Sequence, residues 1–180
     1  MTGLLAAPAQ AAETAASPAD TSSAAPNKAC NGKVTLGMAR NKGDLYHSSA
    51  VTVLVPHNHI GIYYTKNIVV EAPGPGSYSQ SRTASTHRVC GPVYKMSVNA
   101  KQSSRDSAAN YSYQKLRGRP YDKGFLNNKV NGDSKLNCSE LVWKAYKRAA
   151  NIELDYNGGL AVYPDDIKND SSTVIYQTIR

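Results

Sequence analysis

The sequence predicts an α+β fold in which an antiparallel sheet packs against a helix that begins at a cysteine. Residues 59–64 and 68–72 are rich in β-branched and aromatic side chains, and the three residues between them are typical of a β-hairpin turn. Asn137, followed three residues later by Glu140, matches the capping box that begins a helix. The helix therefore begins at Cys138, and its N-terminal turn is expected to face the sheet.

The remaining elements follow from hydrophobic periodicity and from turn residues. They are a strand at 51–55 ended by Pro56, a strand at 89–98 interrupted by Gly91-Pro92, a helix at 103–116, a short helical turn at 162–167 with Asp165 near its cap, and an edge strand at 174–179. The Cys138 helix runs to about residue 150 with Asn151 at its end, and its buried stripe is predicted to be Leu141, Val142, Ala145, Tyr146 and Ala149. Its basic residues, Lys144, Lys147 and Arg148, are expected to complement the helix dipole.

Cys138 lies where a thiol can be activated. The backbone N–H groups and the dipole of a first helical turn favour a thiolate. His59, on the predicted hairpin, is the candidate general base or ion-pair partner. Together the two residues predict a cysteine hydrolase that forms a thioester and uses no cofactor and no metal. Each residue alone also has an ordinary structural interpretation, as a buried apolar cysteine and as a hydrogen-bonded strand histidine.

Other histidines compete with His59 for this role. His57 would share the same strand face, but it directly follows Pro56 at a loop edge, so we prefer His59. His47 and His87 lack a comparable sequence context. A zinc site built from His57, His59 and a cysteine has no recognisable ligand spacing.

Glu71 is the candidate residue that orients His59. With a three-residue hairpin loop, Gly61 lies opposite Glu71, and His59 lies one diagonal step away on the same face. With a two-residue loop the register shifts and Glu71 leaves that face. Gly61, which lacks a Cβ, is expected to let the Cys138 helix approach the sheet.

Several segments resemble the permuted NlpC-type papain-like cysteine hydrolases, in particular their YiiX/YycO-like branch. They are Gly43-Asp44-Leu45, His59-Ile60-Gly61-Ile62-Tyr63, 69–74, Gly118-Arg119-Pro120-Tyr121-Asp122, Cys138-Ser139-Glu140-Leu141-Val142-Trp143 and Pro164-Asp165-Asp166-Ile167. The resemblance covers about Gly43 to Ser172 and implies a circularly permuted papain-like fold, because the histidine strand precedes the cysteine helix. It also implies a triad of Cys138, His59 and Glu71, with Tyr121 bordering the substrate cleft. We add His57 as a second candidate substrate-binding residue.

The N-terminal segment is predicted to be a leader that precedes one domain at 29–180. Residues 1–28 contain an apolar, alanine-rich stretch with an Ala-x-Ala cleavage pattern near Ala11, followed by an Ala/Ser/Thr/Pro-rich segment, so they predict a signal-peptide remnant and a disordered leader. Because Cys138 must remain a free thiol, Cys30 and Cys90 are the expected disulfide pair, with a terminal free Cys30 as the alternative. No stretch reaches transmembrane length.

Charge and resemblance together limit the function. The net charge of +8 comes from scattered lysines and arginines without a nucleic-acid motif, and it suits association with an anionic bacterial cell wall or surface after secretion. The resemblance implies hydrolysis of peptide or isopeptide amides, with peptidoglycan stem peptides as the expected substrate. Two alternatives stay open: an acyltransferase or thioesterase, which requires an apolar groove, and a non-catalytic secreted binding domain.

Overall fold

The computed structural model describes residues 30, 32–49 and 58–180. The predicted strand at 51–55, His57 and the predicted leader therefore lie outside the described residues. The described elements, in chain order, are β1 (Lys33–Thr35), β2 (Leu45–Ser49), β3 (His59–Thr65), β4 (Ile68–Glu71), β5 (Gln80–Thr83), β6 (Arg88–Val98), α1 (Gln102–Lys115), α2 (Cys138–Ala150), α3 (Pro164–Asn169) and β7 (Thr173–Ile179).

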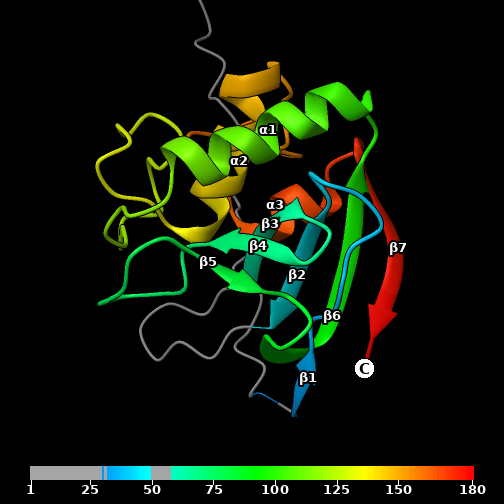
Figure 1. Ribbon diagram of the computed structural model, residues 1–180. Helices are drawn as coiled ribbons and strands as arrows, with labels where there is room; N and C mark the ends of the chain where they lie inside the picture. Colours follow the sequence, from blue (N-terminus) through cyan, green and yellow to red (C-terminus); the bar gives the residue numbers. More distant parts are fainter. Residues whose placement is uncertain (1–29, 31, 50–57) are drawn as a thin grey trace, which may run out of the picture.

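The strands form one antiparallel sheet, and helices α1 and α2 pack together on one side of it (Figure 1). The strand order is β1-β6-β2-β3-β4-β5, and β7 also pairs with β6. The long strand β6 reaches both β1 and β7 because it pairs with β1 at residues 88–90 and with β7 at residues 93–98. The strands β2 and β3 are therefore central in the sheet, and His59, the first residue of β3, pairs with Ser48 of β2.

Two apolar clusters cover the two faces of the sheet. The larger joins the strands to both helices and includes Leu45, Ile62, Met96, Ala108, Leu141, Tyr146 and Cys138 itself. The smaller lies on the opposite face and includes Leu36, Tyr46, Tyr63, Val69 and Val93. Alternation along β2 accounts for this division, because Leu45 and Tyr46 are neighbours in sequence but belong to different clusters.

The structure confirms the α+β class, the hairpin and the Cys138 helix. It also confirms, within a few residues, the helix at 103–116 and the strands at 89–98 and 174–179. Four of the five residues predicted to be buried on α2 are buried, and Ala149 is half-buried. Gly91-Pro92 does not break its strand, since β6 continues through it. The sequence analysis did not predict β1 and β5. Within the described part of the chain, no helix has both the length and the apolar character needed to span a membrane.

Candidate active site

The first turn of α2 is built as the sequence predicts. The Asn137 side chain accepts from the Glu140 backbone N–H at 2.9 Å, and the Glu140 carboxylate accepts from the Asn137 backbone N–H at 3.2 Å. This reciprocal capping box begins the helix at Cys138. Cys138 is completely buried, so an acyl carbon reaches its sulfur only when the surrounding residues open.

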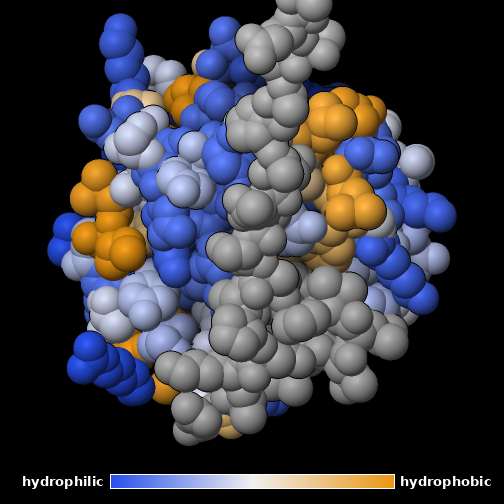
Figure 2. Space-filling view, turned by 180° about the vertical axis from the view of Figure 1, so that it is seen from behind, coloured by the Kyte–Doolittle hydropathy of each residue, from blue (hydrophilic) through white to orange (hydrophobic). Residues whose placement is uncertain are grey.

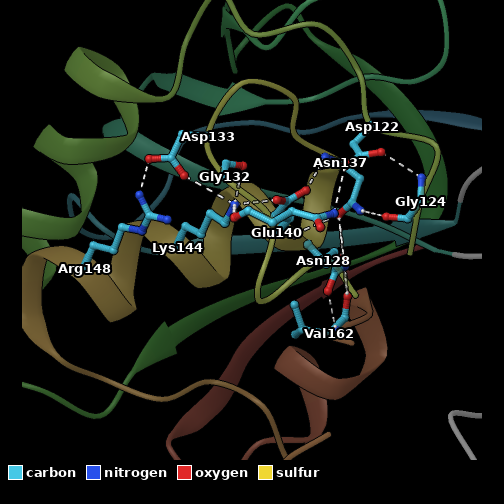
Figure 3. A network of polar contacts seen from close by, with 12 residues as sticks. Asp122, Gly124, Asn128, Gly132, Asp133, Asn137, Glu140, Lys144, Arg148 and Val162 are labelled. Atoms are coloured by element: carbon cyan, nitrogen blue, oxygen red, sulfur yellow. Dashed lines mark hydrogen bonds and ion pairs between the residues drawn. The ribbon is translucent and has the colours of Figure 1, made fainter. Parts of the chain in front are cut away.

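A buried polar network anchors this turn to the loop that precedes it (Figure 3). Lys144 is fully buried, and its ammonium donates to the backbone carbonyls of Asn131 at 2.7 Å and Gly132 at 2.9 Å. It also donates to Glu140 at 2.5 Å and lies 3.3 Å from a carboxylate oxygen of Asp133. The helix-dipole explanation predicted for Lys144 was therefore wrong, because its ammonium points into the protein toward four oxygen atoms.

The hairpin β3–β4 brings Glu71 to His59 by a route that the sequence analysis did not foresee. The turn contains only two residues, but a β-bulge between Tyr63 and Thr65 adds one residue to β3. Ile62 pairs with Val70, which is the register of a three-residue loop. Glu71 therefore stays on the His59 face, and His59 Nε2 lies 2.9 Å from Glu71 Oε2.

Glu71 is a buried hub with four partners. Its Oε2 accepts from the Tyr46 hydroxyl as well as from His59. Its Oε1 accepts from Arg82 Nε at 2.8 Å, and His87 Nε2 lies 3.3 Å from the same oxygen. Burial opposes the charge on Glu71, but His59 and His87 outweigh burial and hold its pKa well below the usual range.

The His59 ring links Glu71 to Cys138. Since Nε2 faces Glu71, Nδ1 is the nitrogen left for the thiol. Burial alone would lower the pKa of His59, but hydrogen bonds with Cys138 and Glu71 raise it to about 10. The imidazolium form of His59 is therefore favoured at neutral pH.

Gly61 has a different role from the predicted one. A Cβ on this residue would lie 2.5 Å from Cε1 of Tyr46 and 3.0 Å from the Val70 carbonyl oxygen. The missing side chain therefore makes room for the Tyr46 ring rather than for the Cys138 helix, and the earlier explanation was wrong.

Sequence reasoning missed three of the four Glu71 partners. Tyr46 lies on β2, which pairs with β3 so that Tyr46 faces Gly61. Arg82 lies on β5, whose sequence Gln-Ser-Arg-Thr lacks the apolar alternation of a predictable strand. His87 lies just before β6. Only the alternation of Tyr46 with the buried Leu45 was visible in the sequence.

His47 belongs to a second polar cluster next to the first. Its Nε2 lies 2.9 Å from Asp165 Oδ1, and Asn58 and Lys168 contact the same carboxylate at 2.8 and 2.9 Å. Asp165 is the second residue of α3 and lies two positions after its cap, Tyr163, in agreement with the sequence prediction. Burial lowers the pKa of His47, although Asp165 opposes this effect. This cluster ties α3 to the strand pair β2–β3.

Tyr121 comes close to the cysteine, as the resemblance implies. It forms an isolated bridge with Leu136, and its backbone N–H donates to the Ser77 carbonyl at 3.0 Å. Burial raises the pKa of Tyr121, and the nearby charges of Cys138 and Asp122 raise it further. A role in substrate binding stays a prediction. The same holds for His57, which lies outside the described residues.

The sulfur atoms of Cys30 and Cys90 are bonded, which is the pairing expected from the sequence. Cys138 is not part of a disulfide. A cavity of about 450 Å³ lies near this bridge, between β1, the middle of β6 and Arg180, and none of the predicted catalytic residues lines it.

The family follows from a sequence comparison. The model of the permuted papain-like amidase enzymes, the YaeF/YiiX or C92 family, matches residues 43–173. The chain belongs to this C92 family. The matched segment contains His59, Glu71 and Cys138, in the permuted order with the histidine first. Membership supports a hydrolase of the amidase type.

Two individual C92-like proteins extend the comparison. The chain is 36% identical over 140 residues to the uncharacterized protein YycO of Bacillus subtilis, a match that covers 77% of this chain and 56% of YycO. The chain thus spans about half the length of this curated relative. The chain also resembles the crystal structure of the metalloprotein YiiX from Escherichia coli O157:H7, with a TM-score of 0.54 and 16% sequence identity. This match covers 78% of this chain and 96% of the YiiX chain, and it supports the fold.

Among the described residues, no group of three or more histidine, cysteine, aspartate or glutamate side chains is arranged to hold a metal ion. The polar side chains next to Cys138 are instead engaged with one another. The reaction proposed below uses no metal.

Proposed function

We propose that this protein is a cysteine amidase or peptidase with Cys138 as nucleophile, His59 as acid and base, and Glu71 as the residue that orients His59. The observation that carries the proposal is the continuous chain of contacts from the thiol through the imidazole to the buried carboxylate. The raised pKa of His59 supplies the imidazolium, and the first turn of α2 favours the thiolate.

The chemistry follows from the placement of these groups. The Cys138 thiolate attacks the carbonyl carbon of an amide, and His59 gives its proton to the leaving nitrogen as the C–N bond breaks. Water then attacks the resulting thioester while His59 accepts one of its protons, which releases the acid and restores the thiolate. The backbone N–H of Cys138 would contribute to an oxyanion hole for both tetrahedral intermediates.

The proposed substrates are peptide or isopeptide amides, with peptidoglycan stem peptides as the first to test. Membership in an amidase family supports the bond type. The net charge of +8 favours an anionic polymer such as the bacterial cell wall. The Cys30–Cys90 disulfide and the alanine-rich N-terminal stretch support secretion, because disulfides persist in oxidising compartments.

The test is digestion of purified peptidoglycan, followed by mass spectrometry of the released fragments. We expect new amine and carboxyl ends from the wild type, and none from Cys138→Ala or His59→Ala. Cys138→Ser is the matched variant, because it keeps the shape of the side chain but replaces the thiolate with a weakly nucleophilic hydroxyl. Equal cleavage by the wild type and Cys138→Ala would refute the proposal, and binding without cleavage by any variant would favour the secreted binding domain.

An exposed apolar patch favours a second candidate, the hydrolysis or transfer of acyl groups. Leu126, Val130 and Leu160 are 77%, 67% and 58% exposed. The two loops that carry them are joined by a hydrogen bond from the Lys129 N–H to the Leu160 carbonyl at 3.2 Å. Figure 2 shows apolar surface on the side of the molecule where the loop between α1 and α2 lies.

This patch lies close to the first turn of α2. Val162, two residues from Leu160, accepts from the Ser139 hydroxyl at 2.7 Å and from the Asn128 side chain at 2.8 Å. Ser139 directly follows the proposed nucleophile, so the loops at 126–130 and 160–162 lie next to the turn that carries Cys138. The apolar groove expected for the acyl-transfer alternative stays a prediction, and the exposed side chains of Leu126, Val130 and Leu160 support it.

Esters of increasing chain length distinguish the two candidates. For an acyl-group enzyme, the hydrolysis rate should rise from acetyl to dodecanoyl esters, and Leu160→Ser or Val130→Ser should remove the rise. Val174→Ser is the matched control, because Val174 is an apolar β7 residue that is 50% exposed and lies away from these loops. A rate that is independent of chain length would leave the amidase as the function.

A further inference from the structure

Both oxygen atoms of the Glu71 carboxylate accept hydrogen bonds, but the donors on the two oxygens differ in their exposure to water. The Arg82 side chain on Oε1 is 43% exposed, so water screens its charge. The Tyr46 side chain on Oε2 is completely buried. A hydrogen bond in a buried, low-dielectric environment is stronger than one that water can replace.

Tyr46 and His59 share one acceptor atom. Both bond to Oε2 of Glu71, and their rings lie 5.9 Å apart at 56°. A terminal carboxylate rotates readily about its last torsion, because that torsion has only broad minima. A second buried donor on Oε2 therefore fixes the direction from which this oxygen meets His59.

Gly61 makes this arrangement possible. The Tyr46 ring occupies the space over Gly61 that a Cβ would fill, at only 2.5 Å from Cε1. Because this contact is with a ring held in the core, and not with the end of a flexible side chain, an added methyl group would displace the ring and its hydroxyl.

We propose that Tyr46 is a positioning residue that holds Glu71 against His59, and that Gly61 is required because it seats the Tyr46 ring. The inference rests on the proposed function for its consequence, since the aligned carboxylate stabilises the His59 imidazolium and so the Cys138 thiolate. Neither residue touches the substrate. Without the Tyr46 hydroxyl, the lower pH limit of the His59–Cys138 ion pair should rise and its upper pH limit should fall.

Tyr63 provides a matched control on the same sheet face. It is also completely buried, and its ring centroid lies 6.2 Å from that of Tyr46. Its hydroxyl donates to the Gly37 backbone carbonyl at 2.8 Å and not to Glu71. Tyr63→Phe therefore removes an equally buried hydroxyl without removing a donor from Glu71.

The experiment measures the rate of Cys138 alkylation by iodoacetamide against pH, by mass spectrometry, in the intact chain. For Tyr46→Phe we expect a rate at pH 6 that is about tenfold lower than in the wild type, the size expected for one hydrogen bond to a charged group. The acidic midpoint should move upward in pH. Tyr63→Phe should stay within about twofold of the wild type, although both variants lose similar stability to urea.

A double-variant cycle tests the link to Gly61. Gly61→Ala should lower the rate at least as much as Tyr46→Phe, and adding Tyr46→Phe to Gly61→Ala should lower it no further. If Gly61→Ala does not fold, the Tyr46→Phe and Tyr63→Phe pair decides the question alone.

Two results would overturn the proposal: a Tyr46→Phe profile equal to that of the wild type while Glu71→Gln is slowed, or an equal slowing in Tyr63→Phe. Neither depends on knowing the substrate. Failure of the proposed amidase function would appear separately, as cleavage that survives Cys138→Ala.

Discussion

Replacing Lys144 with methionine should destabilise the protein in a pH-dependent way. Methionine keeps the length and apolar stem of the side chain but removes the ammonium that contacts Glu140, Asp133 and two backbone carbonyls. Glu140 is left as a buried carboxylate without its cation, and breaking one partner of a buried pair typically costs about 3–5 kcal/mol.

The pH dependence follows from the pKa of Glu140. Burial raises this pKa to about 7, although Lys144 and the Asn137 backbone N–H oppose the rise. Without Lys144 the pKa rises further, and each unit costs about 1.4 kcal/mol at higher pH. The folded protein then keeps a proton that the unfolded chain loses above its ordinary value of 4.5. Stability is therefore retained at low pH and lost as pH rises through the folded pKa.

Urea denaturation at pH 5 and pH 8 measures both effects. At pH 8 a loss of about 4 kcal/mol lowers the midpoint by roughly 2 M, for a slope near 2 kcal/mol per M. At pH 5 we expect a loss smaller by about 2 kcal/mol, because Glu140 is then neutral, and the loss comes from the two carbonyls and Asp133. In the double variant Lys144→Met/Glu140→Gln, most of the difference between the stability losses at pH 5 and pH 8 should disappear.

Lys147→Met is the matched control from the same helix. Lys147 lies 3.2 Å from Glu153, and both side chains are more than a third exposed. Such an exposed pair contributes less than about 1 kcal/mol. The reasoning fails if Lys144→Met costs no more than Lys147→Met, or if its cost is the same at pH 5 and pH 8.

Three further predictions test other parts of the structure. His59→Ala should slow alkylation of Cys138 at pH 6 by roughly tenfold or more, because the free thiol then ionises near its ordinary pKa of about 8.5; equal rates at pH 6 would contradict the ion pair. Replacing both Cys30 and Cys90 with serine should lower the free energy of unfolding by about 4 kcal/mol, the loop-closure value for a bridge spanning 60 residues, as measured by urea denaturation. Burial opposes the charge on Asp165, but His47 and Lys168 hold its pKa well below the usual range, so its contribution to stability is present above about pH 4 and is lost as pH falls. Asp165→Asn should make thermal stability less sensitive to pH between about 2 and 4, and an unchanged sensitivity would contradict this.

The local structure of the candidate site could be predicted from the sequence. The capping box at Asn137 and Glu140 depends on residues three positions apart, so it can be read directly from the chain. The alternation of β3 likewise placed His59 and Gly61 on one face. Glu71 was placed correctly, although the reason differed, because a bulge at Tyr64 replaced the expected loop residue. A bulge has no sequence signature as clear as a turn has.

The partners from distant segments were not predictable in the same way. Arg82 and Tyr46 reach Glu71 only because β5 and β2 pair on either side of the hairpin. Strand order is a property of the whole fold, and the polar sequence of β5 gives no periodic signal. Lys144 was misplaced for a related reason, since a lysine near charged neighbours on a helix is usually solvated, and only the loop at 131–133 makes its burial favourable.

The candidate site thus combines two hydrogen-bonded networks, one on the sheet and one on α2, which the contact between His59 and Cys138 connects. In the sheet, Tyr46 of β2 and Arg82 of β5 fix Glu71 of the hairpin, and Glu71 in turn fixes His59. On the helix, Lys144 fixes the loop and the capping residue Glu140, and so the first turn that carries Cys138. The His59–Cys138 contact connects the two proposed catalytic groups. Changes in the sheet network should therefore alter the charge state of the imidazole, whereas changes in the helix network should alter where the sulfur lies. Because the two effects act on different atoms of one ion pair, their combination should slow alkylation by more than either alone.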